Sequence, residues 1–327
     1  MTVMVMNFDL RHPPQFRPSG AEIYANALDM SAWADANGFA RIGVPEHHQN
    51  EDGYLSCPLV FAAAVGARTT RVRVRTGIVI APLYDPLRLA EEAAVVVLCL
   101  GGRLELGMGL GVLRADYEAF GVDFAQRGRL MEELIPLLRR AWTGEPFAYR
   151  GTSVRVTPRP VQNPMPIFLG GMSQAATDRA ARLADGFHTV MPQTWALYRE
   201  SCRKYGKPDP GPLPQRGPMF LWVSKRDKTT VLRELQPHFD QQVESYEEQN
   251  RKAGGGLVNP WAVKPGQAPP YRIVTPEEAL ELADTLGPAG ELIIQPLLAA
   301  IDPGLAWEML RLLETEVLPH LRPHLRA

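Results

Sequence analysis

Two adjacent histidines and a glutamate form the stretch of this sequence whose side chains are best suited to chemistry. Glu46, His47 and His48 follow the apolar run 42–44 and Pro45. A short buried strand that ends in a proline delivers the next side chains to a polar loop at the rim of a sheet. Imidazole and carboxylate groups placed there can move protons or bind a metal ion. We therefore predict a functional site at the loop that carries Glu46, His47 and His48.

A glycine-rich turn provides a second candidate site. Gly170, Gly171, Met172 and Ser173 follow the apolar run 167–169 and precede a segment with helical spacing. Free N–H groups at the start of a helix, together with a serine hydroxyl and glycines that permit close approach, can bind a phosphate. A serine at this position is equally an ordinary helix cap. The four residues are therefore a candidate phosphate-binding turn.

The elements that must position these residues alternate along the chain. Apolar residues spaced four, three and four apart, such as Ile23, Ala27, Met30 and Ala34, place one apolar face on a helix. Such helices alternate with eight strand candidates, at 3–8, 40–44, 72–81, 104–108, 167–169, 187–190, 219–223 and 292–295. This alternation favours an α/β fold, a single (β/α)8 TIM barrel, whose active site lies at the carboxyl ends of the strands.

Two segments interrupt the alternation, one after the fourth strand and one after the seventh. Residues 144–166 combine turn residues with an alternating Val154 and Val156, which predicts a hairpin insertion. Residues 247–272 contain consecutive glycines and several prolines, which predicts a mobile active-site loop. We interpret residues 1–327 as one barrel domain that carries both insertions.

Composition argues against several classes of partner. The 327 residues are 45% hydrophobic and 22% charged, with a formal net charge of −1, so no basic field attracts nucleic acid or an anionic membrane. Cys57, Cys99 and Cys202 lie far apart, which argues against a disulfide framework or a cysteine metal site. The first residues do not read as a signal peptide, and no apolar run reaches membrane-spanning length. We therefore expect a cytoplasmic protein.

Ordered motifs along most of the chain resemble those of a known family. The motifs are Leu10-Arg11-His12-Pro13-Pro14-Gln15-Phe16, Glu46-His47-His48, Thr76-Gly77-Ile78-Val79-Ile80-Ala81-Pro82, Gly102-Arg103-Leu104-Glu105-Leu106-Gly107, Phe120-Gly121-Val122-Asp123, Trp142-Thr143-Gly144 and Gly170-Gly171-Met172-Ser173. Together they resemble the luciferase-like flavin-dependent monooxygenases. The resemblance implies a barrel that binds reduced flavin mononucleotide (FMN) and activates dioxygen, or in some branches transfers hydride with a deazaflavin.

The resemblance also implies roles for single residues. His47 would lie beside the flavin ring and act as a general base or stabilise a flavin peroxide, work that suits a histidine near its ordinary pKa. Glu46 would orient this histidine or contact the flavin. Gly77 and Ile78 match a position where the family has a non-prolyl cis peptide against the flavin, although a glycine bulge in a buried strand would read the same way. The turn ending at Ser173 matches the phosphate site.

Two departures from the family pattern affect the cofactor site. Several relatives have an arginine after strand four that contacts the phosphate, where this sequence has Gly107-Met108-Gly109-Leu110-Gly111. Arg114, Arg127 and Arg129 are the candidate replacements, and Arg129 is included in the predicted site. Gly109 stands where some relatives have a cysteine beside the flavin, and it is included as well.

We therefore predict a flavin-dependent monooxygenase that uses reduced FMN and O2 to oxygenate a small organic substrate. A separate flavin reductase and a homodimer are expected by analogy. The alternatives are a deazaflavin-dependent hydride-transfer oxidoreductase, a non-catalytic flavin-binding accessory subunit, and a metal-dependent barrel hydrolase with His47, His48 and Glu46 as ligands. Adjacent loop histidines point in different directions, and His188 is the only further strand candidate, so no metal site is predicted.

Overall fold

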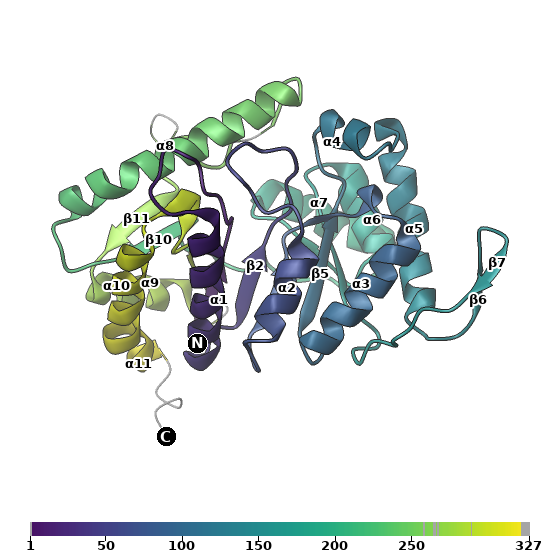
Figure 1. Ribbon diagram of the computed structural model, residues 1–327, viewed down its shortest axis with the longest axis horizontal. Helices are drawn as coiled ribbons and strands as arrows, with labels where there is room; N and C mark the ends of the chain where they lie inside the picture. Colours follow the sequence, from purple (N-terminus) through teal and green to yellow (C-terminus); the bar gives the residue numbers. More distant parts are fainter. Residues whose placement is uncertain (1, 258, 264–265, 267, 289, 322–327) are drawn as a thin grey trace. The chain divides into compact units, whose positions relative to one another are not determined.

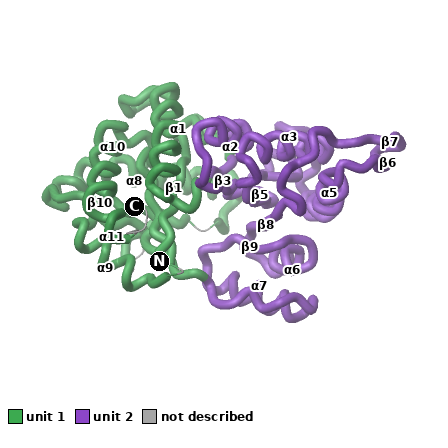
Figure 2. The backbone as a smooth tube through the Cα atoms, turned by 90° about the horizontal axis from the view of Figure 1, so that it is seen from below, with its two compact units in different colours: residues 1–43, 47–55, 214–327 green, residues 44–46, 56–213 purple. Residues whose placement is uncertain are grey.

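The computed structural model describes residues 2–257, 259–263, 266, 268–288 and 290–321, and the protein divides into two compact units (Figure 2). Unit 1 comprises Met1–Gly43, His47–Leu55 and Pro214–Ala327. Unit 2 comprises Val44–Glu46 and Ser56–Leu213. Each unit is therefore assembled from segments that are distant in the sequence.

Unit 1 contains two sets of parallel strands. β1 (Val3–Asn7) pairs with β12 (Glu291–Ile294) on one side and, on the other, with β2 (Arg41–Val44) as far as Gly43. β10 (Phe220–Val223) pairs with β11 (Tyr271–Val274). All four residues of β10 are buried, as expected of a parallel strand that is covered on both faces.

The helices of unit 1 pack through apolar faces that the sequence makes visible. Ile23, Ala27, Met30 and Ala34, the residues with the predicted spacing, have no exposed surface on α1. Capping boxes begin two of the helices, at Ser19 for α1 and at Thr275 for α9. The helices are α1 (Gly20–Ala36), α8 (Lys228–Lys252), α9 (Pro276–Leu286), the 3-10 turn η3 (Leu298–Ala300), α10 (Pro303–Leu312), the π-helical turn η4 (Leu313–Val317) and α11 (Leu318–Leu321).

Unit 2 contains a parallel set of strands and one hairpin. β5 (Leu104–Gly109) pairs with β3 (Arg73–Thr76), β4 (Val79–Ile80) and β8 (Ile167–Gly170), and β8 pairs with β9 (Gly186–His188). β6 (Phe147–Tyr149) and β7 (Thr152–Val154) are antiparallel and project from the rest of unit 2 (Figures 1 and 2). This hairpin lies inside residues 144–166, where the sequence predicts one.

The helices of unit 2 connect these parallel strands. Asp85 caps α3 by accepting from the Leu87 and Arg88 N–H groups, as the Asp-Pro pair in the sequence indicates. The buried Trp142 indole donates to the Ala90 carbonyl of α3 (3.0 Å). The helices are α2 (Pro58–Gly66), η1 (Ala81–Leu83), α3 (Pro86–Cys99), α4 (Arg114–Ala119), η2 (Phe124–Gln126), α5 (Arg127–Ala141), α6 (Gln174–Leu183) and α7 (Pro192–Lys204).

The strand pairs within both units are parallel apart from the hairpin, so the predicted mixed α/β class is confirmed. The segment 247–272 differs from the prediction. α8 (Figure 1, green) continues to Lys252 because its buried face extends to Gln249, and β11 takes residues 271–272. Residues 258, 264, 265 and 267 lie outside the described residues. No helix in the described ranges has the length and apolarity needed to cross a bilayer.

Candidate active site

Gly77 and Ile78, two residues of the predicted cofactor site, directly follow β3, which lies close to β5 in unit 2. The peptide bond between these two residues is cis, as the resemblance implies. The Thr76 hydroxyl donates to the Gly107 carbonyl (2.8 Å) and accepts from the Gly107 N–H (2.9 Å). A Cβ at Gly107 would lie 2.0 Å from the Thr76 carbonyl oxygen, so only glycine allows this approach.

The Ile78 side chain fills the space beside glycines of two neighbouring strands. A Cβ at Gly109 on β5 would lie 2.5 Å from the Ile78 Cδ1 atom, and a Cβ at Gly170 on β8 would lie 3.1 Å from its Cγ2 atom. Gly77 is exposed, and a Cβ there would have no heavy atom within 4 Å. We call the surface formed by Gly77, Ile78, Gly109 and Gly170 the glycine strip. Its open part is Gly77, where no side chain stands in the way of a planar ring.

Glu46 supports the segment that follows this strip. The glutamate is 3% exposed, and its carboxylate accepts from the Ile80 N–H (2.8 Å) and the Tyr84 hydroxyl (3.2 Å). Burial and the Glu46 charge raise the pKa of Tyr84, so this phenol remains a hydrogen-bond donor. Glu46 therefore fixes the backbone two residues beyond Ile78.

The predicted phosphate turn leads into α6. The Ser173 hydroxyl accepts from the Ala176 N–H (3.3 Å), so the serine is a helix cap in this structure. A Cβ at Gly171 would lie 2.5 Å from the Ala176 Cβ atom, which explains the glycine. Met172 is 53% exposed. The Ala176 and Thr177 N–H groups already donate to Ser173, so a phosphate at this turn would rely on the N–H groups that precede them.

The three candidate arginines have different surroundings. Arg129 is largely exposed, donates to Gln126 (2.8 Å), and forms an ion pair with Glu133 (2.6 Å). Arg114 and Arg127 instead lie over the Phe124 ring, with Cζ atoms 4.9 and 3.8 Å from its centroid. Arg114 and Arg127 thus contact the same aromatic ring, whereas Arg129 is paired with the Glu133 carboxylate.

In unit 1, His47 belongs to a stack of three side chains. Its ring is stacked on Tyr54, with centroids 4.0 Å apart and planes inclined by 14°. The Arg11 Cζ atom lies 3.8 Å from the same Tyr54 centroid, so guanidinium and imidazole occupy opposite faces of the phenol. Burial, with the positive charges of Arg11 and His48, lowers the pKa of His47 to about 3. The expectation of an ordinary histidine pKa is wrong for this reason.

Acidic and polar residues around Arg11 complete a buried cluster that the sequence interpretation missed. Arg11 has no exposed surface, and its Nη1 atom donates to Asp52. Asp52 also accepts from the Ser245 hydroxyl (2.9 Å), and Asp9 accepts from Gln242 (2.5 Å). Burial raises the pKa of Asp9, against the opposing effect of Arg11. Charged residues directly after β1, and an aspartate shortly after the histidines, were the available sequence signal.

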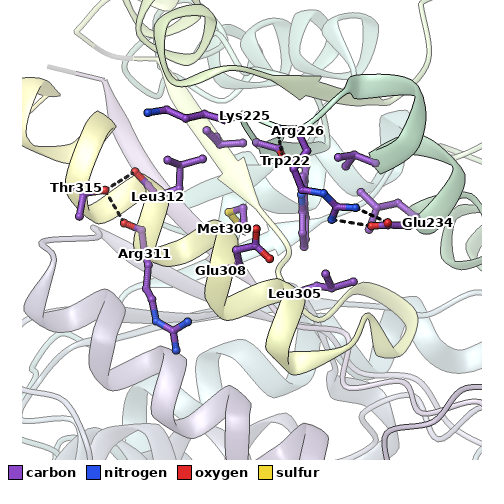
Figure 3. Close-up of a pocket in the computed structure, with 14 residues that line it drawn as sticks. Trp222, Lys225, Arg226, Glu234, Leu305, Glu308, Met309, Arg311, Leu312 and Thr315 are labelled. Carbon is purple, nitrogen blue, oxygen red and sulfur yellow. Dashed lines mark hydrogen bonds and ion pairs between the residues drawn. The ribbon is translucent and has the colours of Figure 1, made fainter.

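A separate cavity of about 350 Å³ in unit 1 contains none of the predicted site residues (Figure 3). Apolar side chains including Trp222, Leu235 and Met309 form much of its lining. At its rim, Arg226 is paired with Glu234, and Lys225 is paired with Glu316. These ion pairs neutralise the rim, so it offers no clear selectivity for a charged ligand.

The described residues contain no group of three or more His, Cys, Asp or Glu side chains that could hold a metal ion. In addition, both carboxylate oxygens of Glu46 are engaged within unit 2. The hydrolase alternative therefore lacks a ligand set in the described part of the chain.

The two units contain parallel strands connected by helices. Unit 2 also has the glycine strip and a helix start suited to a phosphate, so its residues fit a phosphorylated planar cofactor. The chain belongs to the luciferase-like monooxygenase family, whose model matches residues 5–261. The predicted family is thereby confirmed.

Curated relatives of this chain include oxidoreductases that use different cofactors. It is 30% identical over 152 residues to the oxygenase component of the flavin-dependent trigonelline monooxygenase of Acinetobacter baylyi, covering 44% of this chain and 42% of that one. It is 29% identical over 198 residues to the F420-dependent glucose-6-phosphate dehydrogenase of Nakamurella multipartita, covering 57% and 56%. A Mycobacterium tuberculosis protein of unassigned activity is 39% identical over 133 residues, covering 39% and 46%. The matches span about half the length of these relatives or less.

Solved structures share the fold over nearly the whole chain. Monooxygenase RslO1 from Streptomyces bottropensis superposes with a TM-score of 0.76 at 22% identity, covering 98% of this chain and 100% of that one. The oxygenating constituent of 3,6-diketocamphane monooxygenase from Pseudomonas putida, in complex with FMN, gives 0.70 at 17% identity, covering 98% of each. Identities this low establish the common fold alone.

Proposed function

We propose that this protein is an FMN-dependent monooxygenase that receives reduced FMN from a separate reductase and oxygenates a small organic substrate. The observation that carries the proposal is that the glycine strip includes the ends of two adjacent strands of unit 2, β5 and β8, and that β8 leads into the start of α6. Gly109 ends β5, and Gly170 ends the neighbouring β8 directly before the turn to Ser173. A planar ring on the strip and a phosphate at the turn are thus compatible with one nucleotide. The relative named as an oxygenase component supports the reductase.

Residues of unit 2 would hold the phosphate end. The Ser173 hydroxyl and the first-turn N–H groups of α6 would bind the phosphate oxygens. We propose Arg127, with Arg114, as the cationic partner in place of Arg129, because Glu133 already neutralises Arg129. Guanidinium groups bind phosphate in a bidentate manner, which suits this role.

Other residues would hold the ring or accept a hydrogen bond. The glycine strip would contact the ring face, and Glu46 would keep that segment in place through the Ile80 N–H. Reduced FMN, when bound, supplies two electrons, so that one atom of O2 enters the substrate and the other leaves as water. The neutral His47 would accept a hydrogen bond, since burial and nearby positive charge disfavour its protonated form.

The finer part of the fold prediction also belongs to this proposal. We propose that the parallel strands of both units complete one (β/α)8 barrel with a single active site. The hairpin of residues 144–166 and the segment of residues 247–272 would then be insertions after the fourth and seventh strands. Loops at the carboxyl ends of the strands would supply the site, in agreement with the positions of Glu46, Gly109 and Ser173.

A second candidate function is deazaflavin-dependent hydride transfer. Its support is the F420-dependent relative, whose match covers 57% of this chain against 44% for the trigonelline enzyme. The stretch Gly107-Met108-Gly109-Leu110-Gly111, which lacks the phosphate-contacting arginine of several family members, is compatible with either cofactor. Both cofactors carry a phosphate and a tricyclic ring, so the residues above serve either one.

Anaerobic titration with three ligands tests this choice. Reduced FMN, oxidised FMN and reduced deazaflavin F420 are added to separate samples, and binding is followed by fluorescence and by ultrafiltration. We expect the tightest binding for reduced FMN. Preferential binding of F420 would replace the first candidate by the second, and absence of binding by all three would overturn both. Exposure of the reduced FMN complex to O2 with candidate substrates then separates an oxygenase from an accessory flavin-binding subunit.

We propose that the functional form is a cytoplasmic homodimer that pairs through α2 and α3 of unit 2. Val60 on α2 is 72% exposed and Val95 on α3 is 44% exposed, an unusual location for large apolar side chains. A groove of about 360 Å³ between them is also lined by the apolar Leu59, Ala63 and Val96 and by the charged Arg88, Glu91 and Glu92. The same helices of a second copy would cover this apolar face by two-fold symmetry.

A further inference from the structure

A buried cation in unit 1 lies one aromatic ring away from His47. The Tyr54 ring has the His47 imidazole on one face and the Arg11 guanidinium on the other, with contacts of 4.0 and 3.8 Å to its centroid. A guanidinium over a phenol face is attracted by the ring quadrupole, and a stacked ring limits rotation of the imidazole. A substitution of Arg11 should therefore affect the orientation of the His47 imidazole through the Tyr54 ring.

The guanidinium is held by acidic residues from two loops. Arg11 donates through Nη1 to Asp52, and its Nε atom lies 3.9 Å from Asp9. Asp9 also accepts from the Ala299 N–H (3.0 Å), and Asp52 accepts from the Tyr54 N–H (3.3 Å). These contacts fix the positive charge over the Tyr54 ring.

Helix α8 encloses the cluster from a third direction. Gln242 donates to Asp9, and Ser245 donates to Asp52. Tyr246, one residue further along, lies 5.9 Å from the Arg11 Cζ atom and contributes to the raised pKa of Tyr54. The charged and titratable groups around the stack are therefore Arg11, Asp9, Asp52 and Tyr246, together with His48, which follows His47 directly.

Hydrogen bonding alone does not account for Arg11. Among the described residues, its Nε and Nη2 atoms are buried without an acceptor at hydrogen-bond distance. Buried ion pairs of this kind are often no more stabilising than apolar residues of similar volume. The feature that apolar residues could not reproduce is a fixed positive charge on the far face of the ring that carries His47.

We propose that Arg11 and Tyr54 are positioning residues for His47, and that the guanidinium acts through the phenol ring to hold the imidazole in one orientation and in its neutral form. The structural part of this proposal does not involve a cofactor. Its consequence for turnover rests on the proposed function, in which His47 accepts a hydrogen bond.

Histidine titration by NMR in the isotope-labelled full chain tests the structural part. His47→Gln assigns the His47 signal, and the wild-type imidazole should remain neutral down to pH 5. Arg11→Gln removes the nearest positive charge and should raise the pKa of His47 by about one, a roughly tenfold increase in the protonated fraction at a fixed pH. Arg11→Lys keeps the charge, and Tyr54→Phe keeps the ring, so both should retain the low pKa.

Controls make this test independent of folding and of flavin binding. Arg11→Gln leaves two buried acids without their cation. The charge-compensated double variant Arg11→Gln/Asp52→Asn is therefore measured as well, and the pKa of His47 in it should also be higher than in the wild type. An unchanged His47 titration in a folded variant lacking Arg11, or an equal rise in Arg11→Lys, would overturn the proposal. The titration needs no flavin, so a failure to bind flavin would refute the proposed function and leave this result standing.

Turnover provides a second measurement if the protein oxygenates a substrate. The fall of substrate-coupled O2 consumption with decreasing pH should begin about one pH unit higher in Arg11→Gln than in the wild type, because a protonated His47 nitrogen cannot accept a hydrogen bond. The loss should appear in kcat more than in KM. A parallel fall in wild type and variant would show that Arg11 supports the fold only and would overturn the proposed effect on turnover.

Discussion

The fit between Ile78 and its neighbouring glycines predicts that single methyl groups affect folding and binding differently. Gly109→Ala would place a Cβ atom 2.5 Å from the Ile78 Cδ1 atom and 3.0 Å from its Cγ1 atom. Unstrained carbon contacts lie at about 3.5–4.0 Å. Moving the terminal methyl group alone does not relieve the second contact. We expect the free energy of unfolding to fall by about 1–3 kcal/mol, the usual result of overpacking.

Gly77→Ala is the matched variant with the opposite expectation. A Cβ at Gly77 meets no heavy atom within 4 Å, and Gly77 does not have a positive φ angle. The free energy of unfolding should change by less than about 0.5 kcal/mol. If the flavin ring lies on the glycine strip, however, the added methyl group occupies the contact distance of the ring. The affinity for reduced FMN should then fall by about tenfold, which corresponds to roughly 1.4 kcal/mol.

Urea denaturation and anaerobic flavin titration of the same samples separate these effects. Ile78→Val removes the Cδ1 atom and should recover part of the stability lost in Gly109→Ala, with a coupling energy of about 0.5–3 kcal/mol. Wild-type affinity for reduced FMN in Gly77→Ala would refute the placement of the ring. Strictly additive effects of the Gly109 and Ile78 changes would refute the steric argument.

Four further predictions follow from the site and the surface. Ser173→Ala should weaken FMN binding by about 1–3 kcal/mol but leave riboflavin binding unchanged, since riboflavin has no phosphate; equal losses for both ligands would contradict this. Arg127→Gln should weaken FMN binding, whereas Arg129→Gln, the matched control, should not, and the reverse order in the titration would move the phosphate site. Val60→Asp should shift the sedimentation coefficient from dimer to monomer, and an unchanged coefficient would exclude this face. His47 binds a proton near pH 6.5 in the unfolded chain but only near pH 3 in the folded chain. The free energy of unfolding should therefore decrease as the pH falls from 6.5 to 3. His47→Gln should reduce the slope of this free energy against pH by up to about 1 kcal/mol per pH unit.

Elements whose signals are local could be predicted from the sequence. Ile23, Ala27 and Met30 have the spacing of one helix face, and all three are fully buried on α1. Asp85 and Thr275 precede prolines, and each caps the helix that follows. Caps and amphipathic faces are determined within a few residues, so no knowledge of the tertiary structure was needed.

Elements that depend on distant contacts could not be predicted in the same way. β11 has only four residues, and its pairing with β10 joins positions about fifty residues apart, such as Phe220 and Tyr271. The last turns of α8 contain mostly polar residues and precede a run of glycines, which favoured a loop. Ser245 and Gln249 are nevertheless buried there, and the Ser245 hydroxyl donates to the distant Asp52. A tertiary contact of this kind overrides local propensity.

The choice among the arginines shows the same limit at a finer scale. Arg127 and Arg129 are two residues apart in the first turn of α5, which separates their directions by about 200° around the helix axis. Only one of them can therefore face Phe124, and the other pairs with Glu133 one turn further on. The sequence identifies the basic segment, but the rotation of the helix determines which side chain reaches the neighbouring ring.

His47 shows why identifying a reactive residue differs from knowing its chemistry. A loop of adjacent histidines and polar residues predicts solvated imidazoles with an ordinary pKa. The structure instead stacks His47 on Tyr54, and Arg11 on the other face of that ring is held by carboxylates from residues 9 and 52. Burial and positive charge both disfavour the imidazolium form, so their effects on the pKa add. The fold thereby favours a neutral His47 imidazole, which can accept a hydrogen bond, across the physiological pH range.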